Sequence, residues 1–161
     1  MKDMRDLLEG LRRTPNILSQ FVTTIPENRL HVRRGEGFWT IAEHVSHLAE
    51  VQPMLYERFQ RFLNEEQPEF VPYVPTDDET QITVPRFDIL KALEQFTSVR
   101  GMQLELLERA DDATWERLAI HPEYESYSFY ILVRHALMHD YWHMYRIEEL
   151  WLTKDAYLTQ L

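Results

Sequence analysis

The sequence predicts an all-α protein, a four-helix bundle with a long crossover between its second and third helices. Glycine is scarce, with four residues in 161, and apolar residues recur at three- and four-residue spacing through four long segments. A proline-rich, acidic stretch separates the second segment from the third, and it is too long to be a simple turn. At this length we expect a single domain over residues 1–161.

The first two helices are predicted in the N-terminal part of the chain. The first covers Met4 to Val22, with an interruption at Thr14-Pro15. Because proline is tolerated in the first turn of a helix, the main part of this helix is expected to begin there. The second begins after the turn at residues 35–37. There, Thr40 followed three positions later by Glu43 is the sequence signature of a capping box.

The remaining elements follow the crossover. Residues 64–85, with four prolines, predict a long surface loop. The third helix is expected over residues 87–109 and the fourth over residues 128–150. Between them we expect a turn at residues 111–115 and a polar connection at residues 121–127.

Charge and composition exclude several classes of function. With 17 Lys and Arg against 27 Asp and Glu, the net charge of −10 argues against nucleic acid or an anionic membrane surface as a partner. No apolar run approaches the ~20 residues that span a bilayer, and charges stand where a signal peptide has its apolar core. We therefore expect a cytoplasmic protein. The absence of cysteine means that any metal must be held by His, Asp or Glu.

Histidine carries the chemical signal of this sequence. Five of the seven histidines fall in two helical stretches: His44 and His47, then His135, His139 and His143. A column of imidazoles on an apolar-rich helix stabilises little unless something uses the nitrogen lone pairs, and a metal ion would. The last three span about 12 Å of helix, so one ion cannot reach both ends.

A third imidazole from the second helix would complete a three-histidine site with an open position. His44 and His47 both remain candidates. Apolar residues four and eight positions after His47 favour it, weakly, over His44.

Two segments together resemble a known family. The run WTIAEHVSHL at residues 39–48 is similar to the Trp-Ser-x-x-Glu-x-x-x-His-Leu segment of the DinB-like (DinB/YfiT) superfamily. The run HDYWH at residues 139–143 resembles its second segment, and Arg100 stands where many members carry arginine. The resemblance covers nearly the whole chain. Met144 departs from it, because many members have arginine directly after the last histidine.

The resemblance implies a four-helix bundle that holds one divalent ion, often nickel or zinc, through His47, His139 and His143. Imidazole suits both metals, so the choice stays open. Members of known activity include thiol S-transferases and a mycothiol-dependent maleylpyruvate isomerase. The implied function is a metal-dependent thiol S-transferase or hydrolase that acts on a small-molecule substrate, with a low-molecular-weight thiol as a possible cosubstrate.

The residues themselves leave that function open. No general acid or base can be assigned from the sequence, so the catalytic residues stay unknown. The alternative is a non-catalytic, metal-stabilised bundle that binds a small molecule or a protein partner.

Three further residues are candidates to support the ligands. Glu43 either orients a ligand imidazole or serves only the capping box. His135 is a hydrogen-bond donor behind the ligands or a core histidine, and Arg146 replaces the arginine missing at Met144 or is a surface charge. We expect Asp140 to be solvated, because successive helical residues differ by about 100° in direction and Asp140 therefore faces away from the candidate ligand His139.

The C-terminal segment, residues 151–161, keeps large apolar side chains to its last position. Chain ends are usually polar unless they dock on something. The segment predicts a homodimer, as the family resemblance also does, or docking on the first helix of its own chain.

Overall fold

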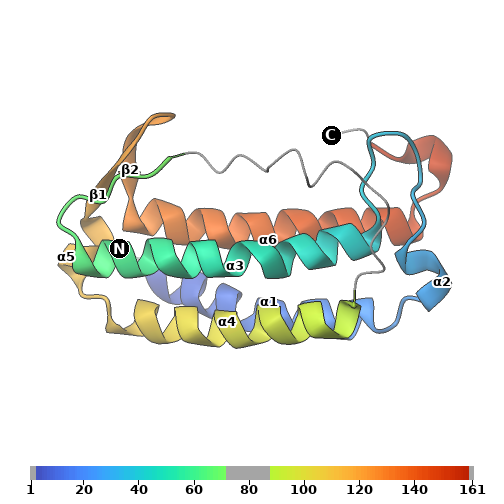
Figure 1. Ribbon diagram of the computed structural model, residues 1–161, viewed down its shortest axis with the longest axis horizontal. Helices are drawn as coiled ribbons and strands as arrows, with labels where there is room; N and C mark the ends of the chain where they lie inside the picture. The colour runs from blue at the N-terminus through green and yellow to red at the C-terminus, as the bar shows by residue number, and fades with distance from the viewer. Residues whose placement is uncertain (1–2, 72–87, 160–161) are drawn as a thin grey trace.

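The computed structural model describes residues 3–71 and 88–159, in which four long helices lie side by side (Figure 1). These are α1 (Met4–Val22), α3 (Ile41–Asn64), α4 (Ile89–Arg109) and α6 (Phe129–Leu152). Shorter elements join them: α2 (Glu27–Leu30), α5 (Asp112–Glu116), strands β1 (Leu118–His121) and β2 (Tyr124–Ser128), and a 3₁₀ helix at Asp155–Tyr157. The predicted four-helix bundle is confirmed.

Two pairs of long helices run parallel, α3 with α4 and α1 with α6. Gln95 of α4 donates to the carbonyl of Ala49 on α3 at 3.2 Å, and Gln103 of α4 donates to that of Gln52 at 2.9 Å. The residue numbers of the bonded partners therefore increase in the same direction along the two helices. Figure 1 shows the same direction for α3 and α4, and likewise for α1 and α6. A parallel pair needs a connection as long as the bundle, which is the predicted crossover. Most of the loop predicted over residues 64–85 lies outside the described residues.

Two short elements between α4 and α6 were not predicted. Residues 121–127, expected to be a polar connection, belong to an antiparallel hairpin in which Ala119 pairs with Tyr127. Its strands have four and five residues, too few for an alternating pattern to be recognised in the sequence. The turn expected at residues 111–115 is mostly α5, whose first turn is capped by Asp111.

The capping box predicted at the start of α3 is present. The backbone N–H of Glu43 donates to the Thr40 hydroxyl at 3.1 Å, and the Thr40 N–H donates to the Glu43 carboxylate at 2.5 Å. Pro15, by contrast, lies inside α1 without interrupting it.

Replacing Thr40 with alanine is expected to lower the free energy of unfolding by about 1 kcal/mol, because the buried cap loses its acceptor. Chemical denaturation measures the change. Thr23→Ala is the control, since the exposed Thr23 hydroxyl bonds only carbonyl oxygens at the end of α1. Equal effects of the two substitutions would contradict the capping role.

The buried core is divided by a layer of polar side chains. One apolar cluster, which includes Leu11 and Phe59, lies toward the hairpin, and the other, which includes Leu18 and Phe96, lies toward α2. Between them every long helix contributes buried polar residues. We call this set the polar layer: Thr14, Gln52, Arg100, Gln103 and Asp140.

Asp140 corrects the expectation of a solvated charge. It is 0 % exposed, it accepts from Arg100 Nη2 at 2.7 Å, and the Thr14 hydroxyl donates to it at 3.0 Å. The face of α6 that lies 100° from His139 packs on α1 and α4 rather than facing water. Burial raises the pKa of Asp140 to about 6, against the opposite effects of Arg100 and Thr14.

The C-terminal segment docks on its own chain. The backbone N–H of Thr159 donates to Glu149 at 3.1 Å, and Arg34 bonds both the Thr153 carbonyl and Asp155. Leu158 packs against the apolar cluster near α2. The apolar tail is therefore covered, in part, by α6 and the loop before α3.

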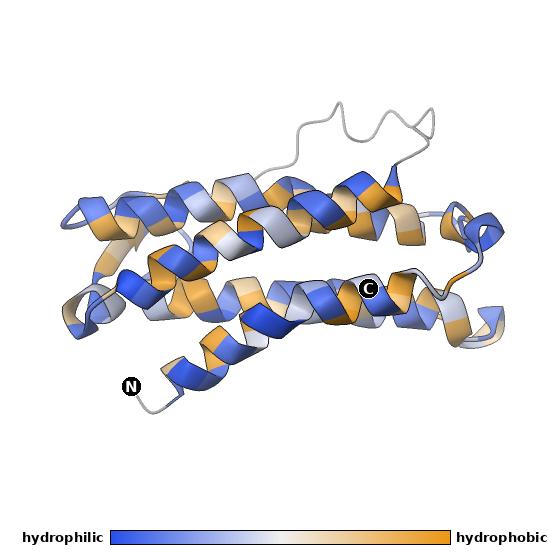
Figure 2. Ribbon diagram, turned by 90° about the horizontal axis from the view of Figure 1, so that it is seen from below, coloured by the Kyte–Doolittle hydropathy of each residue, from blue (hydrophilic) through white to orange (hydrophobic). Residues whose placement is uncertain are grey.

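No helix among residues 3–71 and 88–159 is long and apolar enough to cross a membrane. Figure 2 shows hydrophilic residues interrupting every long helix along its length.

Candidate metal centre

Three histidines from two antiparallel helices meet at the middle of the bundle. His47 Nε2 of α3 lies 3.2 Å from His139 Nε2 of α6, which lies 3.1 Å from His143 Nε2. One nitrogen of each ring lies within 4.8 Å of the others. His139 and His143 share a face because they are one helical turn apart. We call these three residues the histidine cluster.

The cluster fits a divalent cation. Ligand nitrogens at ~2.0–2.1 Å from tetrahedral zinc lie about 3.3 to 3.4 Å apart, close to the spacings found here. Hydrogen bonds between the three rings cannot satisfy all of their facing nitrogens. Two nitrogens face the single Nε2 of His139, which carries either one proton or one lone pair. A cation would use all three lone pairs at once.

His44 lies behind the cluster and was not assigned a role by the sequence. Its Nδ1 is 2.8 Å from Nδ1 of His143, and its side chain is 3 % exposed. Because His143 presents its other nitrogen to the cluster, this hydrogen bond fixes the orientation of the ring. Periodicity favoured His47 over His44 only weakly, since both lie on the wide inward side of α3.

Two tryptophan rings cover the cluster. The ring of Trp39 lies 5.0 Å from that of His47 and 5.8 Å from that of His143. Trp142 meets His143 edge-on at 4.7 Å. Both tryptophans are partly exposed, so they stand between the imidazoles and water.

Burial keeps the imidazoles of His44, His139 and His143 neutral. It lowers the pKa of His139 to about 4, that of His143 to about 2 and that of His44 to about 3. Neighbouring charges add to the effect, among them Arg100 at His139 and Arg146 at His44. Neutral imidazole is the form that binds a metal ion.

The three supporting candidates lie at different places. Glu43 serves the capping box and an ion pair with Arg33 at 2.5 Å. Arg146 is 4 % exposed rather than a surface charge and is ion-paired with Glu149, and its positive charge helps to lower the pKa of His44, which lies behind the cluster. His135 lies outside the cluster, against the rings of two hairpin tyrosines.

The cluster opens onto a pocket of about 300 Å³ between α3 and α6, which we call the α3–α6 pocket. His47 and His139 line it at one end, and the hairpin residues Tyr124 and Tyr127 line it at the other. His135 is part of its wall. A ligand in this pocket would reach the two histidines directly, a relation that the sequence did not reveal.

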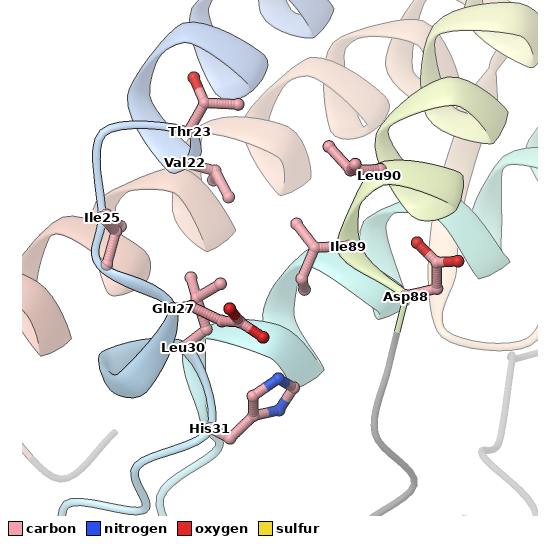
Figure 3. Close-up of a pocket in the computed structure, with 9 residues that line it drawn as sticks. All are labelled: Val22, Thr23, Ile25, Glu27, Leu30, His31, Asp88, Ile89 and Leu90. Atoms are coloured by element: carbon pink, nitrogen blue, oxygen red, sulfur yellow. The ribbon is translucent and has the colours of Figure 1, made fainter.

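A larger cavity of about 570 Å³ lies elsewhere, where the end of α1, α2 and the start of α4 meet (Figure 3). Its lining is mainly apolar, with Glu27, His31 and Asp88 as its charged or titratable members. No residue of the histidine cluster borders it. Cavity size alone therefore does not identify the functional site.

Comparison with known proteins agrees with this geometry. The family model of the DinB superfamily matches residues 10–147. A solved structure, YfiT from Bacillus subtilis, superimposes with a TM-score of 0.82 over 93 % of this chain and 86 % of that one, at 24 % identity. It is described as a probable metal-dependent hydrolase with an unusual four-helix bundle topology.

A relative from Geobacillus thermodenitrificans (strain NG80-2) is 24 % identical over 117 residues, which is 73 % of this chain. Its name assigns it provisionally to the metal-dependent hydrolases. The match spans 66 % of that relative's length, slightly less than two thirds. With the bundle, the histidine cluster and a family match over most of the chain, this protein belongs to the DinB superfamily.

Proposed function

We propose that this protein is a metal-dependent hydrolase whose divalent ion, zinc or nickel, is held by His47, His139 and His143. The observation that carries the proposal is the convergence of three ring nitrogens at the end of a pocket large enough for a small substrate. The names given to two similar proteins, both as metal-dependent hydrolases, support it.

A divalent ion in this position would supply Lewis-acid chemistry to a substrate in the pocket. The side chains of this chain have separate tasks. His44 holds the His143 ring in orientation, and the two tryptophans limit access of water from one side. Two members of the histidine cluster, His47 and His139, also line the α3–α6 pocket, so a substrate bound in that pocket lies beside them.

The test is a screen of small esters, amides and other hydrolysable compounds against protein prepared without a histidine tag. We expect hydrolysis by protein loaded with zinc or nickel, its loss after chelation, and its return when metal is added back. The variant His139→Ala should be inactive at any metal concentration at which the parent is saturated. Hydrolysis that survives metal removal would overturn the proposal.

Thiol transfer is the second reaction to which the family resemblance points. Each reaction of the screen is therefore run with and without a low-molecular-weight thiol. Turnover that requires the thiol, and forms a thioether, would replace hydrolysis by S-transfer. If metal binds but no reaction is found in either series, the non-catalytic alternative would be favoured.

We also propose that the protein forms a homodimer. Four large side chains on one outer stripe of α6 are exposed to water: Met138, Tyr141, Trp142 and Tyr145. A stable interface buries roughly 1,200–2,000 Å² in total and favours aromatic residues. Light scattering at micromolar concentration should give twice the mass of one chain, and Tyr145→Glu should give one. A monomeric parent protein would contradict the proposal.

A further inference from the structure

The α3–α6 pocket contains a charged residue that the proposed function does not use. From the histidine cluster, one face of α3 presents His47, Val51, Leu55 and Arg58 at spacings of four, four and three. Their backbones span about 16 Å, and a helical side chain leans toward the N-terminal end of its helix. Arg58 therefore stands at the end of the pocket away from His47 and reaches back along it.

Arg58 has no acidic partner among the described residues. Arg58 Nη2 donates to the Val71 carbonyl at 2.9 Å, and the guanidinium lies 5.4 Å from the centre of the Phe70 ring. Arg61, one turn later, contacts the same ring but is paired with Glu65 at 2.7 Å. A guanidinium has five N–H donors, so, as far as the described residues go, most of those on Arg58 remain available to a ligand.

The wall between the two ends consists of aliphatic side chains and flat rings. Aliphatic side chains of α3 and α6 form its base. Above them, the rings of His121, Tyr124, Tyr127 and His135 lie against one another, with centroids 4.8 to 5.8 Å apart. Such a wall favours an aromatic or other planar apolar group.

We propose that the α3–α6 pocket binds a small carboxylate whose planar apolar body lies along the ring wall, with the carboxylate on Arg58. Arginine matches a carboxylate with two parallel hydrogen bonds, which makes it a positioning and specificity residue here. The volume of about 300 Å³ is at the lower end for ligand pockets, so the molecule is small. The placement of its other end beside His47 rests on the proposed function.

Glu123 is the acidic residue that also lines this pocket. It lies exposed in the hairpin turn, and none of the ion pairs among the described residues joins it to Arg58. Its negative charge weakens carboxylate binding without cancelling it, because a water-exposed charge is strongly screened.

The test compares 3-phenylpropanoate with its uncharged analogue 3-phenylpropan-1-ol by calorimetry on the full-length protein. Measurements are made on zinc-loaded protein and again after chelation, because a bound ion could itself capture a carboxylate. We expect the acid to bind at least tenfold more tightly than the alcohol in both forms. Arg58→Gln should remove that preference, Arg58→Lys should keep part of it, and Glu123→Gln should increase it.

Arg61→Gln is the matched control and should leave the preference unchanged, since Arg61 lies on the same ring outside the pocket. Circular dichroism melting shows whether each variant is folded. Equal affinity for acid and alcohol in the parent protein, or an unchanged preference in Arg58→Gln, would overturn the inference.

Zinc binding is measured on the same variants to separate the two proposals. Arg58→Gln should bind zinc as the parent does. A parent protein that binds no zinc but prefers the acid would refute the metal-dependent function and leave the carboxylate site standing. A parent protein that binds zinc but does not prefer the acid over the alcohol would refute the carboxylate site and leave the metal-dependent function standing.

Discussion

Replacing Asp140 with alanine is expected to lower the free energy of unfolding by about 3 to 5 kcal/mol, the usual cost of removing one partner of a buried ion pair. The substitution leaves the Arg100 guanidinium, which is 1 % exposed, without its counter-charge. Two of its nitrogens, Nε and Nη1, already lack a hydrogen-bond partner in the described residues. Urea denaturation followed by circular dichroism measures the loss.

A surface ion pair provides the comparison. Glu108→Gln breaks the Arg12–Glu108 pair, whose distance of 2.6 Å is close to the 2.7 Å of the buried pair but whose side chains are both about half exposed. Solvent screening limits its value to roughly 1 kcal/mol or less. The double variant Arg100→Met with Asp140→Leu should recover much of the loss, because neither charge then remains buried. A small effect of Asp140→Ala, no larger than that of Glu108→Gln, would contradict this account.

The fold could be predicted because local signals agreed with the packing. The range Met4–Val22 is the observed α1, and Thr40 begins α3 with the predicted cap. The crossover was visible as composition alone. The hairpin could not be predicted, because its strands are held by pairing between β1 and β2 and by the core contact of Tyr127 rather than by a long pattern.

The site was predicted only in part, for a related reason. The four-residue spacing places His139 and His143 together, but on α3 the apolar spacing favoured His47 over His44 only weakly, and the choice rested on the family resemblance. Asp140 is a charged residue on a helix, and such residues are usually solvated. Its burial follows from α1 and α4 packing on the same side of α6, which a single helix's pattern does not contain. The α3–α6 pocket could not be predicted for the same reason, because its lining comes from α3, α6 and the β1–β2 hairpin together.

His139→Ala is expected to remove metal binding almost entirely, because its Nε2 lies next to both other nitrogens of the histidine cluster. The remaining imidazoles of His47 and His143 stand on different helices and offer only two ligands. Isothermal titration with zinc should show a loss of affinity well beyond 100-fold. At a thousand times the dissociation constant an ion stabilises the folded state by about 4.1 kcal/mol, so the zinc-dependent rise in melting temperature should disappear too.

Substitutions at two other histidines provide an intermediate case and a control for this prediction. His44→Phe fills the space behind His143 without accepting its hydrogen bond, and the loss of such a supporting partner weakens metal binding by roughly 10- to 100-fold. His31→Ala lies in the separate cavity of Figure 3 and should change nothing. The loss of zinc affinity should be largest for His139→Ala, smaller for His44→Phe and absent for His31→Ala. This order distinguishes a three-histidine centre from a nonspecific effect of replacing any histidine. If His139→Ala bound zinc as tightly as His31→Ala, the ligand assignment would be wrong, and the cluster would be a feature of the buried core.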